Sequence, residues 1–111
     1  PGSESKLLKG LELGCEGIIT ATCNVTSELA RKVYDDFLTG SQQSVNQKLC
    51  DVRNVFEKYN LISGLHAYYS RENKCYNKVL PPLKVLNSQD EKDLIENLEK
   101  LNFSIKSLMA A

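Results

Sequence analysis

Apolar residues recur at steps of three and four over most of this sequence, which is the spacing of amphipathic helices. The first set is Leu7, Leu8 and Leu11. Ser3 and Ser5 are candidate caps for this helix, and Gly14 would end it. The second set, between Thr26 and Gly40, is Leu29, Ala30, Val33, Tyr34, Phe37 and Leu38. We therefore predict a short helix after Ser3 and a longer helix that Thr26 caps.

The sequence after residue 40 is helical in pattern throughout. Its longest apolar stripe is Val45, Leu49, Val52, Phe56 and Tyr59, and a shorter helix follows with Leu61, Ile62, Leu65, Tyr68 and Tyr69. Pro81 and Pro82 interrupt the chain after a polar stretch. Ser88 and Glu91 then form a capping box, which predicts a last helix. The apolar face of that helix is Leu94, Leu98, Leu101, Ile105 and Leu108.

Residues 17–22, with the sequence Gly-Ile-Ile-Thr-Ala-Thr, differ from the rest of the chain. The run is short, β-branched and apolar on both faces, which is typical of a strand buried inside a parallel sheet. Such a strand needs neighbours for its backbone groups, and nothing else in the sequence reads as a strand. Either the run is a core helix, or its partner strands lie on another segment. Gly14, Gly17 and the β-branched residues favour the strand.

Composition narrows the class of protein. Fourteen Lys and Arg balance fourteen Asp and Glu, so the net charge is zero and a nucleic-acid partner is not expected. The 41% hydrophobic fraction is typical of a soluble globular chain, and no apolar run reaches the ~20 residues of a membrane helix. The irregular spacing of the four cysteines and the lack of a recognisable signal peptide predict a cytoplasmic protein with reduced thiols. With one histidine, a metal site is not expected, and we predict no cofactor.

Four segments carry a family resemblance. They are Pro-Gly-Ser-Glu-Ser (residues 1–5), Gly-Cys-Glu-Gly-Ile-Ile-Thr-Ala-Thr-Cys-Asn-Val (residues 14–25), Gly-Leu-His-Ala-Tyr (residues 64–68) and Val-Leu-Pro-Pro-Leu (residues 79–83). In the same order they resemble segments of the dihydrodipicolinate synthase and N-acetylneuraminate lyase family. Its members typically have a Gly-Ser/Asp-Asp/Glu turn, a Gly-x-Gly-Ile-Ser-x-x-x-Asn-Val strand, and Gly-Leu-Lys-Ala and Val-Arg-Pro-Pro-Leu segments. The resemblance extends from the first residue to about Leu101.

The resemblance implies an α/β fold of which this chain is a mostly helical part. Residues 1–40 would be the end of a (β/α)8 TIM barrel, with its seventh helix, eighth strand and eighth helix. Residues 41–111 would be a C-terminal helical extension. A whole barrel takes about 250 residues, so we expect a remainder of the same enzyme to supply the other strands.

The chemistry that the resemblance implies is that of a class I aldolase. A lysine forms a Schiff base with pyruvate or a related 2-keto acid, and the imine stabilises the carbanion when a C–C bond is made or broken. In the family this lysine lies on the sixth strand and a tyrosine proton relay on the fifth, so we expect no catalytic residue in this chain. Lys6 and Lys9 lie on helical or loop stretches. His66 is expected to have a surface or packing role, and Cys23 to be a small buried apolar residue.

The resemblance does place part of the substrate site in this chain. Gly2, Ser3 and Glu4 would form the loop after the seventh strand, which lines the pocket for the second substrate. Ser3 and Glu4 would accept hydrogen bonds from substrate hydroxyls or an amine, and the main-chain carbonyl of Ile19 would face the keto acid. The alternative is that the turn only caps a helix and that Ile19 is only a core residue.

Two functions from different classes remain open on the sequence. The first is a pyruvate-dependent lyase, expected to be a homotetramer, whose substrates are pyruvate and a small aldehyde or a keto sugar acid. Within it, a dihydrodipicolinate-synthase-like enzyme would use aspartate semialdehyde, whereas a 2-keto-3-deoxygluconate aldolase would cleave a sugar acid. The second is a free-standing helical interaction domain without enzymatic activity, in which the apparent strand is a buried helix.

Overall fold

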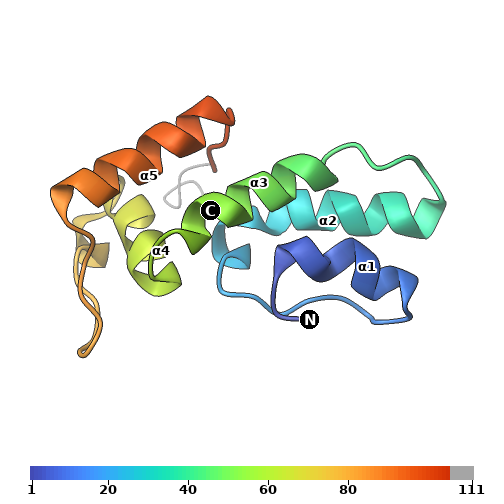
Figure 1. The fold of residues 1–111 in the computed structure, drawn as a ribbon, viewed down its shortest axis with the longest axis horizontal. Helices are drawn as coiled ribbons and strands as arrows, with labels where there is room; N and C mark the ends of the chain where they lie inside the picture. The colour runs from blue at the N-terminus through green and yellow to red at the C-terminus, as the bar shows by residue number, and fades with distance from the viewer. Residues whose placement is uncertain (106–111) are drawn as a thin grey trace. The chain divides into compact units, whose positions relative to one another are not determined.

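The computed structural model describes residues 1–105 and consists of helices joined by loops (Figure 1). The chain divides into two compact units, Pro1–Asn54 and Val55–Ala111. The first unit contains the 3-10 helix η1 (Glu4–Lys6), α1 (Leu7–Glu12), α2 (Cys23–Thr39) and most of α3 (Asn46–Glu57). The second unit contains the end of α3, α4 (Leu61–Ser70), the 3-10 helix η2 (Lys74–Tyr76) and α5 (Ser88–Lys100).

The core of the first unit lies where α1 packs beside α2 (Figure 1). The predicted apolar faces supply it, since Leu7, Leu11, Ala30, Val33 and Leu49 are buried in one cluster. Leu8, Leu29, Tyr34, Phe37 and Val45 pack against this cluster. Leu38 was predicted on the same face but is 61% exposed, because it lies one position further round the helix than Phe37.

The second unit has its own core, in which α4 packs against α5. Its buried apolar residues are Val55, Phe56, Leu65, Ala67, Tyr68, Leu94, Leu98 and Phe103. The rings of Phe56 and Tyr68 meet edge to face with centroids 6.2 Å apart. Gly64 permits this packing, because a Cβ at that position would lie 3.3 Å from the Phe56 ring. The predicted stripes of the last three helices are therefore confirmed in their central positions.

The strand predicted over residues 17–22 is not present among the described residues, and that prediction was wrong for this structure. Residues 15–20 form a non-helical segment, and α2 already begins at Cys23 instead of after Thr26. A strand is defined by hydrogen bonds to a neighbour. Within residues 1–105, the amide of Ile19, which donates to the carbonyl of Pro1 (3.1 Å), is the single paired backbone donor of residues 16–22. The predicted barrel boundary at residue 40 stays a prediction.

The two ends of α5 also differ from the sequence expectation. Asn87, not Ser88, is the N-cap, and its side chain accepts a hydrogen bond from the amide of Asp90 (2.8 Å). The helix ends at Lys100 because Asn102 adopts a left-handed conformation, with φ 53°. Ile105 therefore lies in a loop after the helix, and Leu108 lies outside the described residues.

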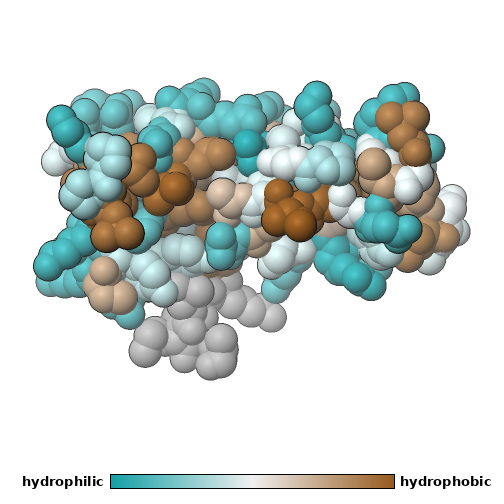
Figure 2. Space-filling view, turned by 90° about the horizontal axis from the view of Figure 1, so that it is seen from below, coloured by the Kyte–Doolittle hydropathy of each residue, from teal (hydrophilic) through white to brown (hydrophobic). Residues whose placement is uncertain are grey.

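Apolar side chains also reach the surface, where brown patches interrupt the hydrophilic exterior in Figure 2. The exposed large apolar residues are Leu13, Ile19, Leu38, Ile62, Leu80 and Val85. Ile19 is the most exposed of them, at 93%. Within the described part of the chain, no helix combines the length and apolar character that crossing a membrane requires.

Asp36 joins the end of α2 to the loop that precedes α3. Its buried carboxylate accepts hydrogen bonds from Lys32 Nζ (2.7 Å), Ser44 Oγ (2.8 Å) and the amide of Ser44 (3.2 Å). The hydrogen bond from Lys32 is the largest cause that lowers the pKa of this carboxyl group, and the bonds from Ser44 add to it. The ionised form of Asp36 therefore stabilises the first unit.

We expect a Gly40→Ala substitution to lower the free energy of unfolding by about 1 kcal/mol, because Gly40 ends α2 with φ 70°, where a side chain is strained. Urea denaturation followed by circular dichroism measures this difference. Gly17→Ala is the matched control, because a Cβ there would meet no atom within 4 Å and no left-handed φ is involved. Equal effects of the two substitutions would contradict the prediction.

We expect Asp36→Asn to lower the thermal midpoint at neutral pH and to have progressively less effect as the pH falls. The folded pKa of Asp36 lies below the ordinary value of 3.8, so the contribution of this carboxyl to stability is complete above that ordinary value and disappears as the pH falls through the folded pKa. Thermal melts between neutral and acidic pH test this. Asp35→Asn removes only an exposed pair with Arg31 and serves as control. A difference that is constant with pH would refute the assignment.

Candidate functional site

The predicted substrate turn begins with Ser3, which caps η1. Ser3 has an extended backbone (φ −144°, ψ 140°), and its hydroxyl accepts a hydrogen bond from the amide of Ser5 (3.4 Å). The two hydroxyl groups are also 2.9 Å apart. The capping role that the sequence suggested for Ser3 is therefore confirmed, while the side chain remains half-exposed.

Gly2 and Ile19, two further predicted site residues, lie side by side. The amide of Ile19 donates to the carbonyl of Pro1 (3.1 Å), so residues 1–2 run next to the segment that contains Ile19. The carbonyl oxygen of Ile19 is 3.8 Å from the position that a Cβ would take on Gly2. The structure therefore brings Gly2, Ser3 and the main chain of Ile19 to one edge of the first unit.

Glu4 faces the opposite way and is completely buried. Its Oε1 accepts hydrogen bonds from Thr20 Oγ1 (2.5 Å) and from Arg53 Nη1 (3.3 Å). Its Oε2 accepts from the hydroxyl groups of Thr22 and Thr26, the latter at 3.1 Å. Both oxygens are thus occupied inside the protein, whereas the sequence predicted that the carboxylate would accept a hydrogen bond from a substrate. That role is not tested in this structure and stays a prediction.

Arg53 completes the cluster from α3. Its Nη1 donates to the hydroxyl oxygens of Thr20 (2.9 Å) and Thr22 (3.0 Å) in addition to Glu4, and only 9% of its side chain is exposed. Desolvating two charges is costly, and the attraction between them offsets this cost only when additional hydrogen bonds satisfy both groups. The three threonine hydroxyl groups supply such bonds. Removing one partner of a buried pair of this kind typically costs about 3–5 kcal/mol.

Arg53 was not among the residues predicted from the sequence, although the sequence contains a signal for it. Leu49, Val52 and Phe56 form the buried stripe of α3, and Arg53 follows Leu49 by four residues. Position 53 therefore lies on the apolar face of the helix. A charged residue at such a position requires a buried partner. The sequence alone could not show that this partner is Glu4.

The cysteines give no sign of nucleophilic chemistry. All four are free in this structure. Burial is the largest cause that raises the pKa of the Cys23 thiol, and the charge of Glu4 acts in the same direction while Thr26 and Arg53 oppose it. Burial also raises the pKa of Cys50. The described residues contain no cluster of three His, Cys, Asp or Glu side chains that could hold a metal ion.

His66 lies in the second unit and packs within it. Its Nδ1 lies 2.9 Å from the carbonyl oxygen of Tyr76, and since that oxygen can only accept, Nδ1 is the donor. The two rings meet edge to face with centroids 6.1 Å apart. This arrangement agrees with the packing role that the sequence suggested for His66.

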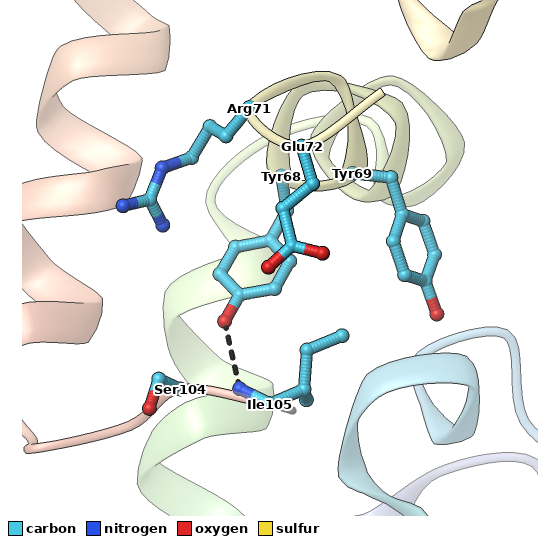
Figure 3. Close-up of a pocket in the computed structure, with 6 residues that line it drawn as sticks. All are labelled: Tyr68, Tyr69, Arg71, Glu72, Ser104 and Ile105. Carbon is cyan, nitrogen blue, oxygen red and sulfur yellow. Dashed lines mark hydrogen bonds between the residues drawn. The ribbon is translucent and has the colours of Figure 1, made fainter. Parts of the chain in front are cut away.

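A cavity of ≈ 230 Å³ opens at the end of α4, in the second unit (Figure 3). It is lined by Tyr68, Tyr69, Arg71, Glu72, Ser104 and Ile105. The hydroxyl of Tyr68 accepts a hydrogen bond from the amide of Ile105 (3.1 Å), which joins α4 to the loop after α5. None of the substrate-binding residues predicted from the sequence lines this cavity.

Comparisons with known proteins agree with the motifs. The model of the dihydrodipicolinate synthetase family matches residues 1–101. Two curated proteins described as uncharacterized DapA-like lyases, from Halobacterium salinarum strains R1 and NRC-1, are each 26% identical over 103 residues. The alignments cover 90% of this chain and 34% of each relative, so the chain spans about a third of the length of the curated relatives it matches. No solved structure matches the chain significantly. Since the family model covers nearly the whole chain, this chain belongs to the dihydrodipicolinate synthetase family.

Proposed function

We propose that this chain is the C-terminal part of a Schiff-base-forming lyase that makes or cleaves a C–C bond between pyruvate and an aldehyde. The observation that carries the proposal is the family match over residues 1–101. The two relatives named DapA-like lyases support it, since each is about three times as long as the matched region. In this proposal the remainder of the protein supplies the other strands of a (β/α)8 barrel, and the complete enzyme is a homotetramer.

The segment that contains Ile19 supports the barrel. Among the described residues, one backbone donor of residues 16–22 is paired, and the side chain of Ile19 is 93% exposed. Strands on both sides of this segment would satisfy its backbone groups, as they do for every strand of a closed barrel. The hydrogen bond from Ile19 to Pro1 already joins the segment to the residues that precede η1.

The proposed chemistry needs a lysine amine that is deprotonated near neutral pH, which burial in the mouth of a barrel provides. The described lysines do not offer this environment, since Lys48 is half-buried and the others are exposed. We therefore assign the Schiff-base lysine, and the tyrosine that relays protons, to parts of the enzyme outside residues 1–111.

This chain would contribute the rim of the active site. Active sites of (β/α)8 barrels form from the loops at the C-terminal ends of the strands. We assign Gly2 and Ser3 to the wall of the pocket for the second substrate, and the main-chain carbonyl of Ile19 to the side that faces the keto acid. We also assign Glu4 to this rim as the residue after Ser3, with its carboxylate turned inward toward Arg53. The second substrate is an aldehyde such as aspartate semialdehyde, or the enzyme instead cleaves a 2-keto-3-deoxy sugar acid.

Borohydride reduction in the presence of pyruvate tests the reaction class. We expect the complete enzyme to gain one reduced pyruvyl adduct on a lysine, and peptide mapping to place that lysine outside residues 1–111. Omission of pyruvate is the control, because reduction then has no imine to trap. An adduct on a lysine within this chain would contradict our assignment, and the absence of any adduct would contradict the proposed function.

The alternative, a free-standing helical interaction domain, is supported by the lack of any strand within residues 1–105. It predicts that residues 1–111 alone form a soluble monomer that unfolds cooperatively. Our proposal predicts association or binding of a hydrophobic dye, because Ile19, Leu13 and Leu38 are exposed in the first unit. Size-exclusion chromatography and urea denaturation distinguish the two. An Ile19→Ser variant should associate less than the parent chain if this surface is responsible.

A further inference from the structure

We propose that Arg53 is a positioning residue that sets the spacing between the two walls of the proposed substrate site. One wall is formed by Gly2 and Ser3, and the other by the main chain of Ile19. This inference rests on the proposed function, since it concerns the same pocket rim. Arg53 belongs to α3 and is separated from Glu4 by 49 positions in the sequence. No substrate role is assigned to it above.

The contacts of one nitrogen atom carry the inference. Arg53 Nη1 lies within hydrogen-bond distance of Glu4 Oε1 (3.3 Å), Thr20 Oγ1 (2.9 Å) and Thr22 Oγ1 (3.0 Å). Glu4 directly follows the Gly2–Ser3 wall, and Thr20 directly follows Ile19. The guanidinium group therefore contacts the residues that directly follow both walls of the proposed pocket.

Little else joins these two walls. Their direct backbone link is the single hydrogen bond from Ile19 to Pro1, and the direct side-chain links run through the carboxylate of Glu4. That carboxylate is completely buried, so it needs the positive charge of Arg53 beside it. Loss of this charge would leave Glu4 unpaired and would favour its movement toward solvent, which would shift Ser3 relative to Ile19.

Arg53 acts through these residues and not on the substrate itself. Only 9% of its side chain is exposed, and its Nη1 contacts Glu4, Thr20 and Thr22 inside the first unit. The imine should therefore still form in an Arg53 variant, because the lysine belongs to another part of the enzyme. The step that requires both substrates in register should slow, since a misplacement of about 1 Å can reduce a rate by roughly 10²-fold.

The test compares Arg53→Met, Arg53→Lys and Val52→Ala in the complete enzyme. Val52 is the matched control, because it is fully buried in the same helix and does not belong to the Glu4 cluster. The readouts are borohydride trapping with pyruvate alone, and kcat and KM for the substrate that the wild-type enzyme uses. That substrate is either aspartate semialdehyde with pyruvate or 2-keto-3-deoxygluconate alone.

We expect Arg53→Met to retain the pyruvate adduct and to lose about 10²-fold in kcat/KM. Arg53→Lys should recover part of that loss, because it restores the charge but not the planar group of donors. Val52→Ala should lose thermal stability with little change in kcat/KM. Adding Glu4→Gln to Arg53→Met should recover stability, because no buried charge then remains unpaired. Turnover should not recover, because the link that Arg53 provides between the two walls is still missing.

Two results separate the inference from the proposed function. If the wild-type enzyme traps no pyruvate adduct or turns over neither substrate, the proposed function fails and the inference fails with it. If the adduct forms but Arg53→Lys and Arg53→Met change kcat/KM no more than Val52→Ala does, the positioning role is wrong while the proposed function stands. Should Arg53→Met fail to fold, Arg53→Lys alone decides between these outcomes.

Discussion

The buried pair of Glu4 and Arg53 is the interaction on which the first unit depends. A carboxylate with no exposed surface is tolerated only when a positive charge and hydrogen-bond donors surround it. Arg53 supplies the charge, and the hydroxyl groups of Thr20, Thr22 and Thr26 supply further bonds. This requirement brings together the first turn, the segment before α2, the start of α2 and the middle of α3. The apolar contact of α1 with α2 does not by itself fix that arrangement.

The same cluster connects stability to the proposed chemistry. Gly2, Ser3 and the main chain of Ile19 lie at the edge of the first unit, and Glu4 and Thr20 follow them in sequence and turn inward. A substrate would thus meet a rim whose inner side is a charged network. Such a network is rigid when all its members are satisfied. This rigidity is what a site needs if it must hold two reactants in register.

The segment around Ile19 differs from the Glu4 and Arg53 cluster, because its backbone is sparsely hydrogen-bonded and the side chain of Ile19 is exposed. The sequence predicted a strand there from the β-branched pattern of residues 17–22, and the described chain offers that run no partner strand. The β-branched pattern of a segment indicates only that the segment is suited to a sheet. Whether it forms one depends on the backbone groups of the segments that lie beside it.

The helices and the family could be predicted from the sequence alone. The spacing of Leu7 and Leu11, or of Leu94 and Leu98, fixes which face of a helix is buried, because periodicity is a local property. The ends of α5 differ from the prediction, since Asn87 is the N-cap and the left-handed Asn102 follows the last turn. The inward direction of Glu4 and its contact with Arg53, by contrast, follow from the packing of the helices. A contact between residues 49 positions apart depends on how α1, α2 and α3 pack, and no local pattern in the sequence records that packing.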